Sequence, residues 1–302
     1  MNPATKILLI DDDPDIAGMI TLLVSGFRRG PFVVEHVADY AEGLQRLLSG
    51  AYALCLLDYH LGDRNGLELL REAKAVRCPT PVILLTGSGR EEIDMAAMDS
   101  GAVDYMEKCD VTRHGLERAV CYALEMAKVM AQLREMATHD ELTGVLNRRE
   151  FDRRLQDEWQ RSVSFQRPLA LVMLDIDHFK QINDTHGHLL GDEVLRHVAR
   201  VLMGQVRPVD CLARYGGDEF ALIMLETSHQ DAHATANRLH ALLGATPCQV
   251  PAKQLTIGMK ISAGVAAWPT DADSLTGLIA AADAALYAAK RQGRDRVLAA
   301  GG

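Results

Sequence analysis

The sequence predicts an α/β protein in two parts, a doubly wound parallel-sheet domain over residues 1–125 and an α+β domain over residues 139–300. A helical linker over residues 116–138, which overlaps the last helix of the first part, joins them. Three observations predict this organisation. Short apolar runs alternate with helical segments in the first part, as in a parallel sheet covered on both faces. No Gly or Pro occurs from about residue 116 to residue 137. Strands and helices alternate in the second part without a long parallel series.

Length and composition exclude several classes of protein. The chain has 302 residues, 48% of them hydrophobic and 24% charged, enough for two domains with cores of their own. No apolar run approaches the ~18 residues that cross a bilayer, and the opening MNPATKILLIDDD has too short an apolar run for a signal peptide. We therefore expect a cytoplasmic protein with no membrane partner. The net charge of −9 and the lack of a basic stripe argue against nucleic-acid binding. The cysteines are scattered, with no C-x-x-C pair, and are interpreted as reduced thiols.

The expected strands of the first part end in polar residues. The first strand covers Ile7–Ile10, and later strands end at Asp58, Thr86 and Lys108. In doubly wound sheets, ligands bind beyond the carboxyl ends of the strands. We therefore expect one cluster of side chains at that edge: Asp11, Asp12, Asp58, Thr86 and Lys108.

This cluster has the composition of a phosphorylation site. Three carboxylates suit a magnesium ion, which prefers oxygen ligands. One carboxylate can attack a phosphoryl donor and become an aspartyl phosphate, while a lysine and a hydroxyl hold the added oxygens. Any one of these residues alone is better explained as a solvated loop residue. The five together, in this order, favour the site.

Over about residues 4–125 the sequence resembles the receiver domain of two-component response regulators. The resemblance implies that Asp58 is the phosphoacceptor and that a histidine kinase is the partner. Magnesium would be held by Asp12, Asp58 and the carbonyl of His60, with Asp11 in support. Phosphoryl binding and switching would fall to Thr86, Lys108 and the aromatic Tyr105. Two positions depart from the family pattern: Cys109 follows the lysine where proline is usual, and Gly87 follows the threonine.

The linker is expected to be a helix. Its apolar residues step by four and three, which is heptad-like spacing: Leu116, Val120, Ala123, Ala127 and Met130. Such a helix would reach about 30 Å at 1.5 Å per residue. Its first half is expected to pack on the first sheet. We interpret its second half as a stalk that pairs with a second subunit, giving a homodimer.

In the second part, Thr138 or Asp140 is expected to cap a short helix that Gly144 breaks before the next helix begins at Arg148. A buried strand, LALVML, leads to Asp175, and the stretch RYGGDEF forms a hairpin before the apolar ALIM. A later strand, KISAGVAAW, precedes a closing helix. The pattern suits a compact ferredoxin-like sheet with helices on one face.

The hairpin sequence RYGGDEF raises a chemical question, because the neighbouring carboxylates of Asp218 and Glu219 repel each other. A cation between them removes that cost. Asp175, at a strand end, is expected to face Asp218 from the adjacent strand, making an oxygen site for one or two magnesium ions that suits phosphoryl or nucleotidyl transfer. Gly216 and Gly217 would let the backbone approach a phosphate. Three cations are candidates for a triphosphate tail, the last two one helical turn apart: Lys180, Lys290 and Arg294.

Over about residues 136–299 the sequence resembles the GGDEF family, the diguanylate cyclases, through DELTGVLNR, DIDHFKQIND, GHLLGD, RYGGDEF and LYAAKRQGR in order. The resemblance implies a homodimeric cyclase that joins two GTP molecules into cyclic di-GMP with release of two pyrophosphates. Mg²⁺, with Mn²⁺ as an alternative, would be bound by Asp175, the Ile176 carbonyl, Asp218 and Glu219. Asp218 or Glu219 would take the proton of the attacking 3′-hydroxyl, and the sequence leaves that choice open. Lys180 would stabilise the transition state. The remaining substrate contacts would come from His178, Phe179, Asn183, His188 and Asp192.

Two further features concern guanine. A carboxylate such as Asp192 can accept from both N1–H and the amino group of guanine, which adenine lacks, so GTP is favoured over ATP. Upstream of the hairpin, Arg207 and Asp210 form the R-x-x-D pattern that precedes it in family members with product inhibition. Arg238 would be the second arginine of that inhibitory site, because arginine can grip guanine bidentately. On its own, an R-x-x-D pattern is usually a surface ion pair. Its spacing from GGDEF in this sequence favours the inhibitory site instead.

One alternative concerns the metal, and two concern the function. His178, His186 and His188 resemble a metal cluster, but the nearby oxygen ligands argue against zinc. A degenerate module that only senses cyclic di-GMP would use the inhibitory site, yet the expected catalytic residues are all present. A DNA-binding regulator would need a helix-turn-helix or a basic surface, and neither is apparent. The sequence therefore predicts a phosphorylation-regulated diguanylate cyclase with product inhibition.

Overall fold

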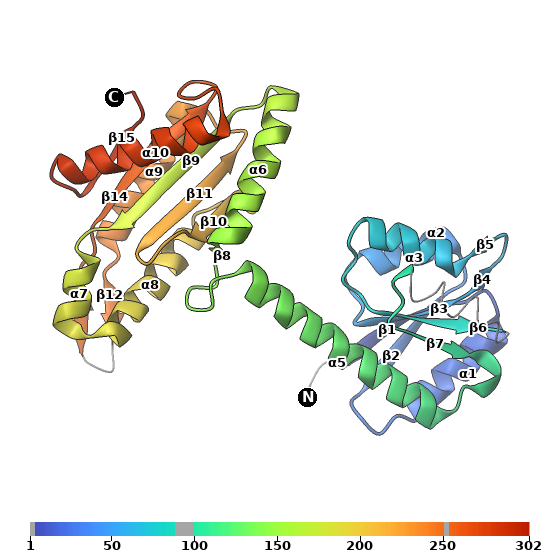
Figure 1. Cartoon of the computed structure of the whole chain (residues 1–302). Helices are drawn as coiled ribbons and strands as arrows, with labels where there is room; N and C mark the ends of the chain where they lie inside the picture. Colours follow the sequence, from blue (N-terminus) through green and yellow to red (C-terminus); the bar gives the residue numbers. More distant parts are fainter. Residues whose placement is uncertain (1–3, 88–99, 251–253, 302) are drawn as a thin grey trace. The chain divides into compact units, whose positions relative to one another are not determined.

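The computed structural model describes residues 4–87, 100–250 and 254–301. The chain divides into two compact units between Leu133 and Arg134 (Figure 1). No helix among the described residues combines the length and the apolar character needed to span a bilayer.

The first unit contains a five-stranded parallel sheet in the order β2-β1-β3-β6-β7. The strands are β1 (Thr5–Ile10), β2 (Phe32–Val37), β3 (Leu54–Asp58), β6 (Val82–Thr86) and β7 (Asp104–Glu107). A small hairpin, β4 (His60–Leu61) and β5 (Arg64–Asn65), follows β3. Sequence reasoning missed β2, an edge strand that is mostly half-buried and therefore lacks a long apolar run.

Helices cover both faces of this sheet, as predicted. The helices are α1 (Pro14–Ser25), α2 (Tyr40–Leu48), α3 (Gly66–Ala75) and α5 (Arg113–Thr138), with a 3₁₀ turn at Lys108–Asp110. Successive residues of β1 point to opposite faces. Ile7 and Leu9 lie in the core with α1 and α5, whereas Leu8 and Ile10 lie in the core with α2 and α3. The doubly wound architecture is confirmed.

Helix α5 is longer than the predicted linker and has two different environments. Leu116, Val120 and Ala123 of the expected heptad stripe are buried in the core of the first unit. Beyond Ala123 the side chains of α5 are exposed or half-buried. The first part of α5 therefore contributes to the core, whereas its second part leaves apolar side chains exposed to solvent.

The second unit is a six-stranded mixed sheet in the order β15-β14-β9-β11-β10-β8. Its strands are β8 (Leu146–Asn147), β9 (Leu169–Ile176), β10 (Cys211–Arg214), β11 (Glu219–Leu225), β14 (Ile261–Trp268) and β15 (Arg296–Ala299), with a separate hairpin of β12 (Cys248–Val250) and β13 (Leu255–Ile257). Its helices are α6 (Arg148–Phe165), α7 (Phe179–His186), α8 (His188–Met203), α9 (His229–Ala245) and α10 (Leu275–Arg291).

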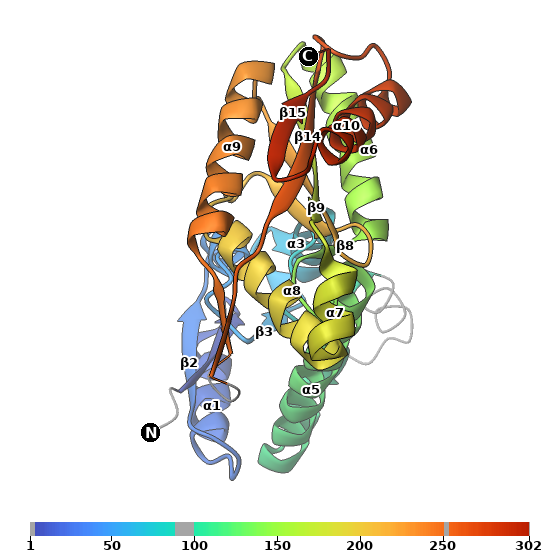
Figure 2. The ribbon, with the colours of Figure 1, turned by 90° about the vertical axis from the view of Figure 1, so that its left-hand side faces the viewer.

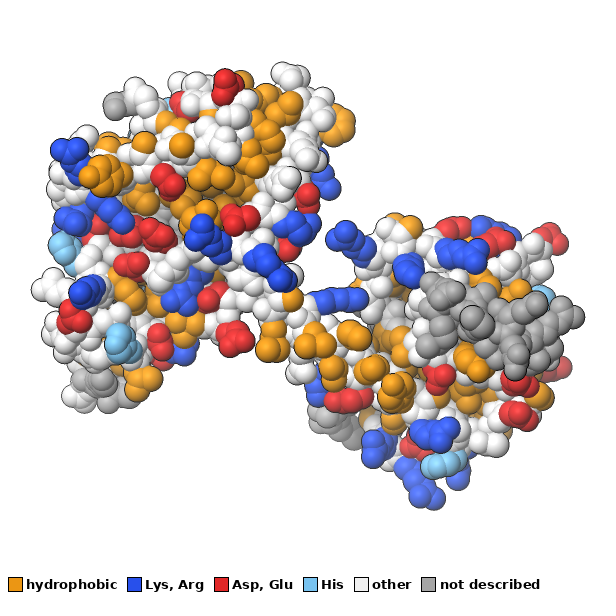
Figure 3. Space-filling view, in the orientation of Figure 1, with side chains coloured by type: hydrophobic (Ala, Val, Ile, Leu, Met, Phe, Trp, Pro, Cys, Tyr) orange, Lys and Arg blue, Asp and Glu red, His pale blue; other side chains and the backbone are white. Residues whose placement is uncertain are grey.

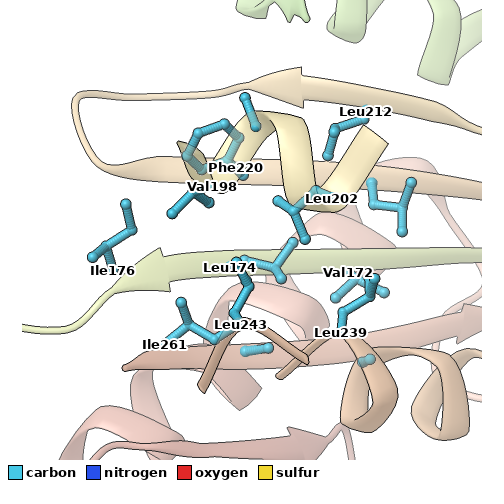
Figure 4. Close-up of a cluster of buried hydrophobic side chains, with 14 of the residues drawn as sticks. Val172, Leu174, Ile176, Val198, Leu202, Leu212, Phe220, Leu239, Leu243 and Ile261 are labelled. Atoms are coloured by element: carbon cyan, nitrogen blue, oxygen red, sulfur yellow. The ribbon is translucent and has the colours of Figure 1, made fainter. Parts of the chain in front are cut away.

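The expectation of helices on one face of this sheet is wrong. Every residue of β9 and β14 is buried, so each strand has apolar side chains on both faces that must be covered. Helices α8 and α9 cover one face and α6 and α10 the other (Figure 2). Val172 and Leu174 of β9 point towards α8 and α9 (Figure 4), whereas Leu171 and Met173 pack with α6 and α10.

The expected short helix after the linker is not formed. Residues 139–147 form a turn that leads into β8. Asp140 closes this turn because its carboxylate accepts from the Thr143 N–H at 2.9 Å and from the Thr143 hydroxyl at 2.6 Å. Asn147 then caps α6 by accepting from the Glu150 N–H. Side chains that could cap a helix here close a turn instead.

Candidate functional site

The structure brings the five predicted residues of the first unit to the carboxyl edge of its sheet. Lys108 Nζ lies 2.8 Å from Asp11 Oδ2 and 2.9 Å from Asp58 Oδ2. Carboxylate oxygens of Asp11, Asp12 and Asp58 lie within 4.8 Å of one another. Thr86 ends β6 and is buried. These donors are all oxygens, so they fit a magnesium ion.

The surroundings of Asp58 disfavour its ionised form. Burial raises the pKa of Asp58, and the charge of Asp11 raises it further, while the hydrogen bond from Lys108 opposes both. For Lys108, burial lowers the pKa, but hydrogen bonds with Asp11 and Asp58 outweigh that effect and the pKa is raised. The lysine therefore stays charged and holds two carboxylates together.

Sequence reasoning missed one glycine of this site. A side chain at Gly66 would overlap the carbonyl oxygen of Asp58, and the Gly66 N–H donates to the Tyr59 carbonyl at 2.7 Å. Only glycine lets α3 begin this close to the end of β3. The glycine in DRNG was the available signal.

Asp12 and two further predicted residues, His60 and Tyr105, lie at the rim of the first site. The side chains of His60 and Asp12 are exposed, and Asp12 accepts from the Gly62 N–H at 3.0 Å. Tyr105 is 37% exposed and lines a groove of about 560 Å³ with Arg118 and Tyr122 of α5. The predicted switch aromatic is therefore next to the helix that leads out of the unit.

In the second unit, the register of β9 and β11 decides which carboxylates meet. Glu219, rather than Asp218, is the residue opposite Asp175. The Asp218 carbonyl accepts from the Ile176 N–H at 3.2 Å, so Asp218 sits one position outside the ladder. The expected facing of Asp175 and Asp218 is therefore shifted by one residue.

A lysine contacts one of these carboxylates. Lys290 Nζ lies 2.6 Å from Asp175 Oδ2. Burial raises the pKa of Asp175, the Lys290 contact opposes this, and the charges of Asp218 and Glu219 raise it further. Among the described residues, these three carboxylates do not meet as closely as those of the first unit. Three negatively charged carboxylates, one of them buried, still fit a divalent cation.

The hairpin tip is held in place by residues that sequence reasoning missed. Arg214 donates from Nε and Nη2 to the Gly217 carbonyl at 3.1 and 2.8 Å, and its Nη1 lies 3.2 Å from both carboxylate oxygens of Asp140. A Cβ at Gly216 would lie 2.6 Å from Glu219 Oε2. A side chain at 216 would therefore displace the Glu219 carboxylate, and Arg214 ties the tip to the turn that follows α5.

The predicted nucleotide residues lie on the loop after β9 and on the two helices that follow. His178 and Lys180 are exposed at the start of α7, with Phe179 buried between them. Asn183 Oδ1 is buried and has no hydrogen-bond partner within the described protein. His188 and Asp192 lie in the first turns of α8, exposed and half-buried respectively. A buried amide oxygen without a partner is the feature expected of a ligand contact.

The prediction that Lys290 and Arg294 lie one helical turn apart on a helix is wrong. Helix α10 ends at Arg291, and Arg294 lies in the following turn with a φ of +62°. Arg294 Nε is 3.9 Å from a carboxylate oxygen of Asp177, a residue that sequence reasoning did not assign.

The three residues predicted for an inhibitory site line one cavity of about 380 Å³: Arg207, Asp210 and Arg238. Arg207 pairs bidentately with Asp210 at 2.7 and 2.8 Å. It also donates to the Thr227 hydroxyl at 2.8 Å. Thr227 and Thr235 share the cavity and were missed, because they lie in a different part of the sequence from the R-x-x-D pattern.

Comparison with known proteins gives two family matches. Residues 137–296 match "Diguanylate cyclase, GGDEF domain" and residues 7–120 match "Response regulator receiver domain". The chain is 39% identical over 164 residues to the response regulator PleD of Caulobacter vibrioides, a match covering 54% of this chain and 36% of PleD. It is 38% identical over 175 residues to the probable diguanylate cyclase DgcC of Escherichia coli, covering 58% and 46%. The matches thus span less than half of either relative.

Solved structures show the same fold for the second unit. The coiled coil and GGDEF domain of DgcB from Caulobacter crescentus, in complex with c-di-GMP, is 33% identical with a TM-score of 0.57, and the match covers 62% of this chain and 98% of that one. The GGDEF domain of the same protein is 36% identical with a TM-score of 0.53, covering 55% and 97%. With more than half of its residues matched by the family model, this chain belongs to the GGDEF family of diguanylate cyclases and carries a receiver domain ahead of its GGDEF domain.

Proposed function

We propose that this chain is a phosphorylation-regulated diguanylate cyclase, which condenses two GTP into cyclic di-GMP and two pyrophosphates. The observation that carries the proposal is the register that sets Asp175 opposite Glu219, with Asp218 at the same hairpin tip and Lys290 in contact with Asp175. The 3′-oxygen of one GTP bonds to the α-phosphorus of the other as the bond to pyrophosphate breaks. Asp218 or Glu219 takes the hydroxyl proton.

Cations, a metal site and base-binding groups of this chain would hold the substrate. Lys180, Lys290 and Arg294 supply positive charge for the triphosphate. A divalent cation at Asp175 would offset the negative charge that gathers on the phosphoryl oxygens. With that cation present, Lys290 is free to leave Asp175 for phosphate. Asn183 and Asp192 offer an acceptor pair to the N1–H and amino group of guanine, which adenine does not match.

A second copy of the chain is required, because each half of cyclic di-GMP comes from one GTP on each of two domains. The surface that suits this pairing is a stripe on α5 with steps of four and three residues, the spacing of a two-stranded coiled coil. Figure 3 shows hydrophobic side chains along this helix. The stripe comprises Tyr122, Met126, Val129, Leu133 and Met136, four of them at least 39% exposed.

Phosphorylation of Asp58 by a histidine kinase would regulate this pairing. The added phosphoryl oxygens would compete for Lys108, which now holds Asp11 and Asp58 together. Thr86 lies at the same strand edge, and Tyr105 borders the groove against α5. Phosphorylation of Asp58 could therefore alter the position of α5, the helix that carries the dimer stripe, through Thr86 and Tyr105.

Product inhibition is supported by the cavity at Arg207, Asp210 and Arg238. Its two arginines can grip guanine O6 and N7, while Asp210 can accept from the opposite edge of the base. Arg207 and Asp210 are hydrogen-bonded to each other in this structure, so guanine would have to replace that ion pair to bind both groups.

The test uses the purified chain with GTP and magnesium, with and without a small phosphoryl donor, and separates the nucleotides by chromatography. We expect cyclic di-GMP from the wild type, none from Asp218→Ala, and stimulation by the donor that is lost in Asp58→Ala. Asp13→Asn, which changes a helix-capping carboxylate beside the first site, should keep the stimulation. Absence of product in every state, with tight binding of added cyclic di-GMP, would instead identify a sensor.

A further inference from the structure

Asp177 is a buried carboxylate that the proposed mechanism does not use. It is the second aspartate of Asp-Ile-Asp and lies just beyond the end of β9, 5% exposed. Its two oxygens accept from the Ser262 hydroxyl at 2.8 and 3.1 Å, and Oδ2 also accepts from the Asp295 N–H at 2.9 Å. The carboxylate is therefore hydrogen-bonded to β14 and to the turn between α10 and β15.

That turn adopts an unusual backbone conformation. Gly293, Arg294 and Asp295 have φ values of +111°, +62° and +51° in succession. Two consecutive non-glycine residues remain in this region only where the surrounding structure holds them. The Arg294 N–H donates to the Ala289 carbonyl at 3.0 Å, and the Asp295 N–H donates to Asp177. These two hydrogen bonds hold the turn from opposite sides.

The side chain of Asp295 fixes the turn to two further elements. It pairs with Lys260, which precedes β14, at 2.6 Å and with His240 of α9 at 2.9 Å. The Asp177 N–H donates to the Lys260 carbonyl at 2.9 Å, so the same segment closes the network. The turn that carries Arg294 is therefore bonded to Asp177, to His240 and to Lys260. The Nε atom of Arg294 lies 3.9 Å from the Asp177 carboxylate.

We propose that Asp177 is a positioning residue for GTP binding: by holding the α10–β15 turn, it sets the guanidinium of Arg294 for the triphosphate. This inference rests on the proposed function, which places Arg294 at that group. It assigns the two aspartates of Asp-Ile-Asp to different tasks, the first to the cation and the second to the turn. An arginine on an unanchored turn would lose affinity through the entropy of ordering it.

The test is a double-mutant cycle in the full chain with Asp177→Asn, Arg294→Ala and the combination. Asparagine can still accept from the Asp295 N–H and donate to the Ser262 hydroxyl, so the fold is kept. A neutral amide accepts less strongly than a carboxylate, so the substitution loosens the hold on the turn and also removes the charge facing Arg294. We expect KM for GTP to rise about tenfold in Asp177→Asn and about 100-fold in Asp177→Ala, with kcat changing less. In the Arg294→Ala background, Asp177→Asn should add no further rise.

A matched control is Asp271→Asn, which alters a half-buried carboxylate in the turn that follows β14. Asp271 accepts from the Ala267 N–H at 2.7 Å near the other end of β14. It should lower the midpoint of thermal unfolding as much as Asp177→Asn does while leaving KM unchanged. Independent, multiplying effects of the Asp177 and Arg294 changes, or a wild-type KM in Asp177→Asn, would overturn the proposal.

Failure of the proposed function gives a different pattern. If the wild type forms no cyclic di-GMP, the dissociation constant of GTP replaces KM in the same cycle. Weaker GTP binding in Asp177→Asn that vanishes in the Arg294→Ala background would still support the positioning role. GTP binding that is equal in all four proteins would overturn it.

Discussion

Gly191 offers a substitution that separates nucleotide binding from folding. It lies in the first turn of α8, and a Cβ there would overlap the amide oxygen of Asn183, 3.0 Å from Asn183 Cγ and 3.2 Å from Phe179 Cζ. In Gly191→Ala, Asn183 must turn away from its present position. Alanine is also the better helix former by about 1 kcal/mol, which offsets the cost of that movement. We therefore expect the midpoint of thermal unfolding to change little.

The loss should appear in GTP binding instead. Asn183 Oδ1 is buried without a partner, so its hydrogen bond to the nucleoside would be made only in the complex. A side-chain amide contact to a base contributes about 1–3 kcal/mol. KM for GTP should therefore rise about 5- to 150-fold, with a smaller change in kcat. Initial rates over a range of GTP concentrations, together with a thermal melt of the same sample, measure both quantities.

The control uses a glycine at the opposite end of the same helix. Gly204 follows α8 with a φ of −67°, and a Cβ there would lie 3.5 Å from the Arg200 carbonyl oxygen, an ordinary contact. Gly204→Ala should leave KM and stability near the wild type. A wild-type KM in Gly191→Ala would refute the assignment of Asn183 to the nucleoside. A variant that fails to fold would show that Asn183 is part of the core.

Three further predictions concern the dimer, the fold and the inhibitory cavity. Leu133→Glu places a charge in the α5 stripe and should shift the dimer to monomer in sedimentation; product formation should fall with it, and an unchanged dimer would remove α5 as the pairing surface. Hydrogen bonds from Arg153 lower the pKa of Glu150 to about 2. The stabilisation by ionised Glu150 should therefore be complete above pH 4.5 and disappear as the pH falls towards 2. Glu150→Gln should thus cost about 1–3 kcal/mol at pH 7, and thermal melts in which that difference fails to narrow at pH 3 would contradict the linkage. Arg207→Ala should raise the cyclic di-GMP concentration for half-inhibition about 5- to 150-fold; equal inhibition of both proteins would exclude the cavity.

The strand ends of the first unit were predictable because their signals are local. Each buried strand is an apolar run followed by a polar residue, and in a parallel sheet these ends share one edge. Asp11, Asp58 and Lys108 meet there as expected. The edge strand β2 was missed because a strand at the edge buries little, and its pattern resembles that of a loop.

The second unit was harder because its assembly depends on non-local pairing. The motif RYGGDEF predicts a hairpin, but only the register of β11 on β9 decides that Glu219 faces Asp175. The second helical layer followed from β9 being buried on both faces, which an apolar run alone does not reveal. The end of α10 at Arg291 put Arg294 into a turn that no helical periodicity could have described.

The sequence by itself determined which chemistry this protein carries: two carboxylate sites, a candidate triphosphate contact and an R-x-x-D pair, each set by residue types at short spacing. The tertiary structure decided which of these groups meet. It put Lys108 between Asp11 and Asp58, Lys290 against Asp175, and Asp177 under the turn that presents Arg294. The physical reason is that a local pattern records burial and backbone preference. Contacts between residues far apart in the sequence depend instead on sheet order, register and the packing of a second layer.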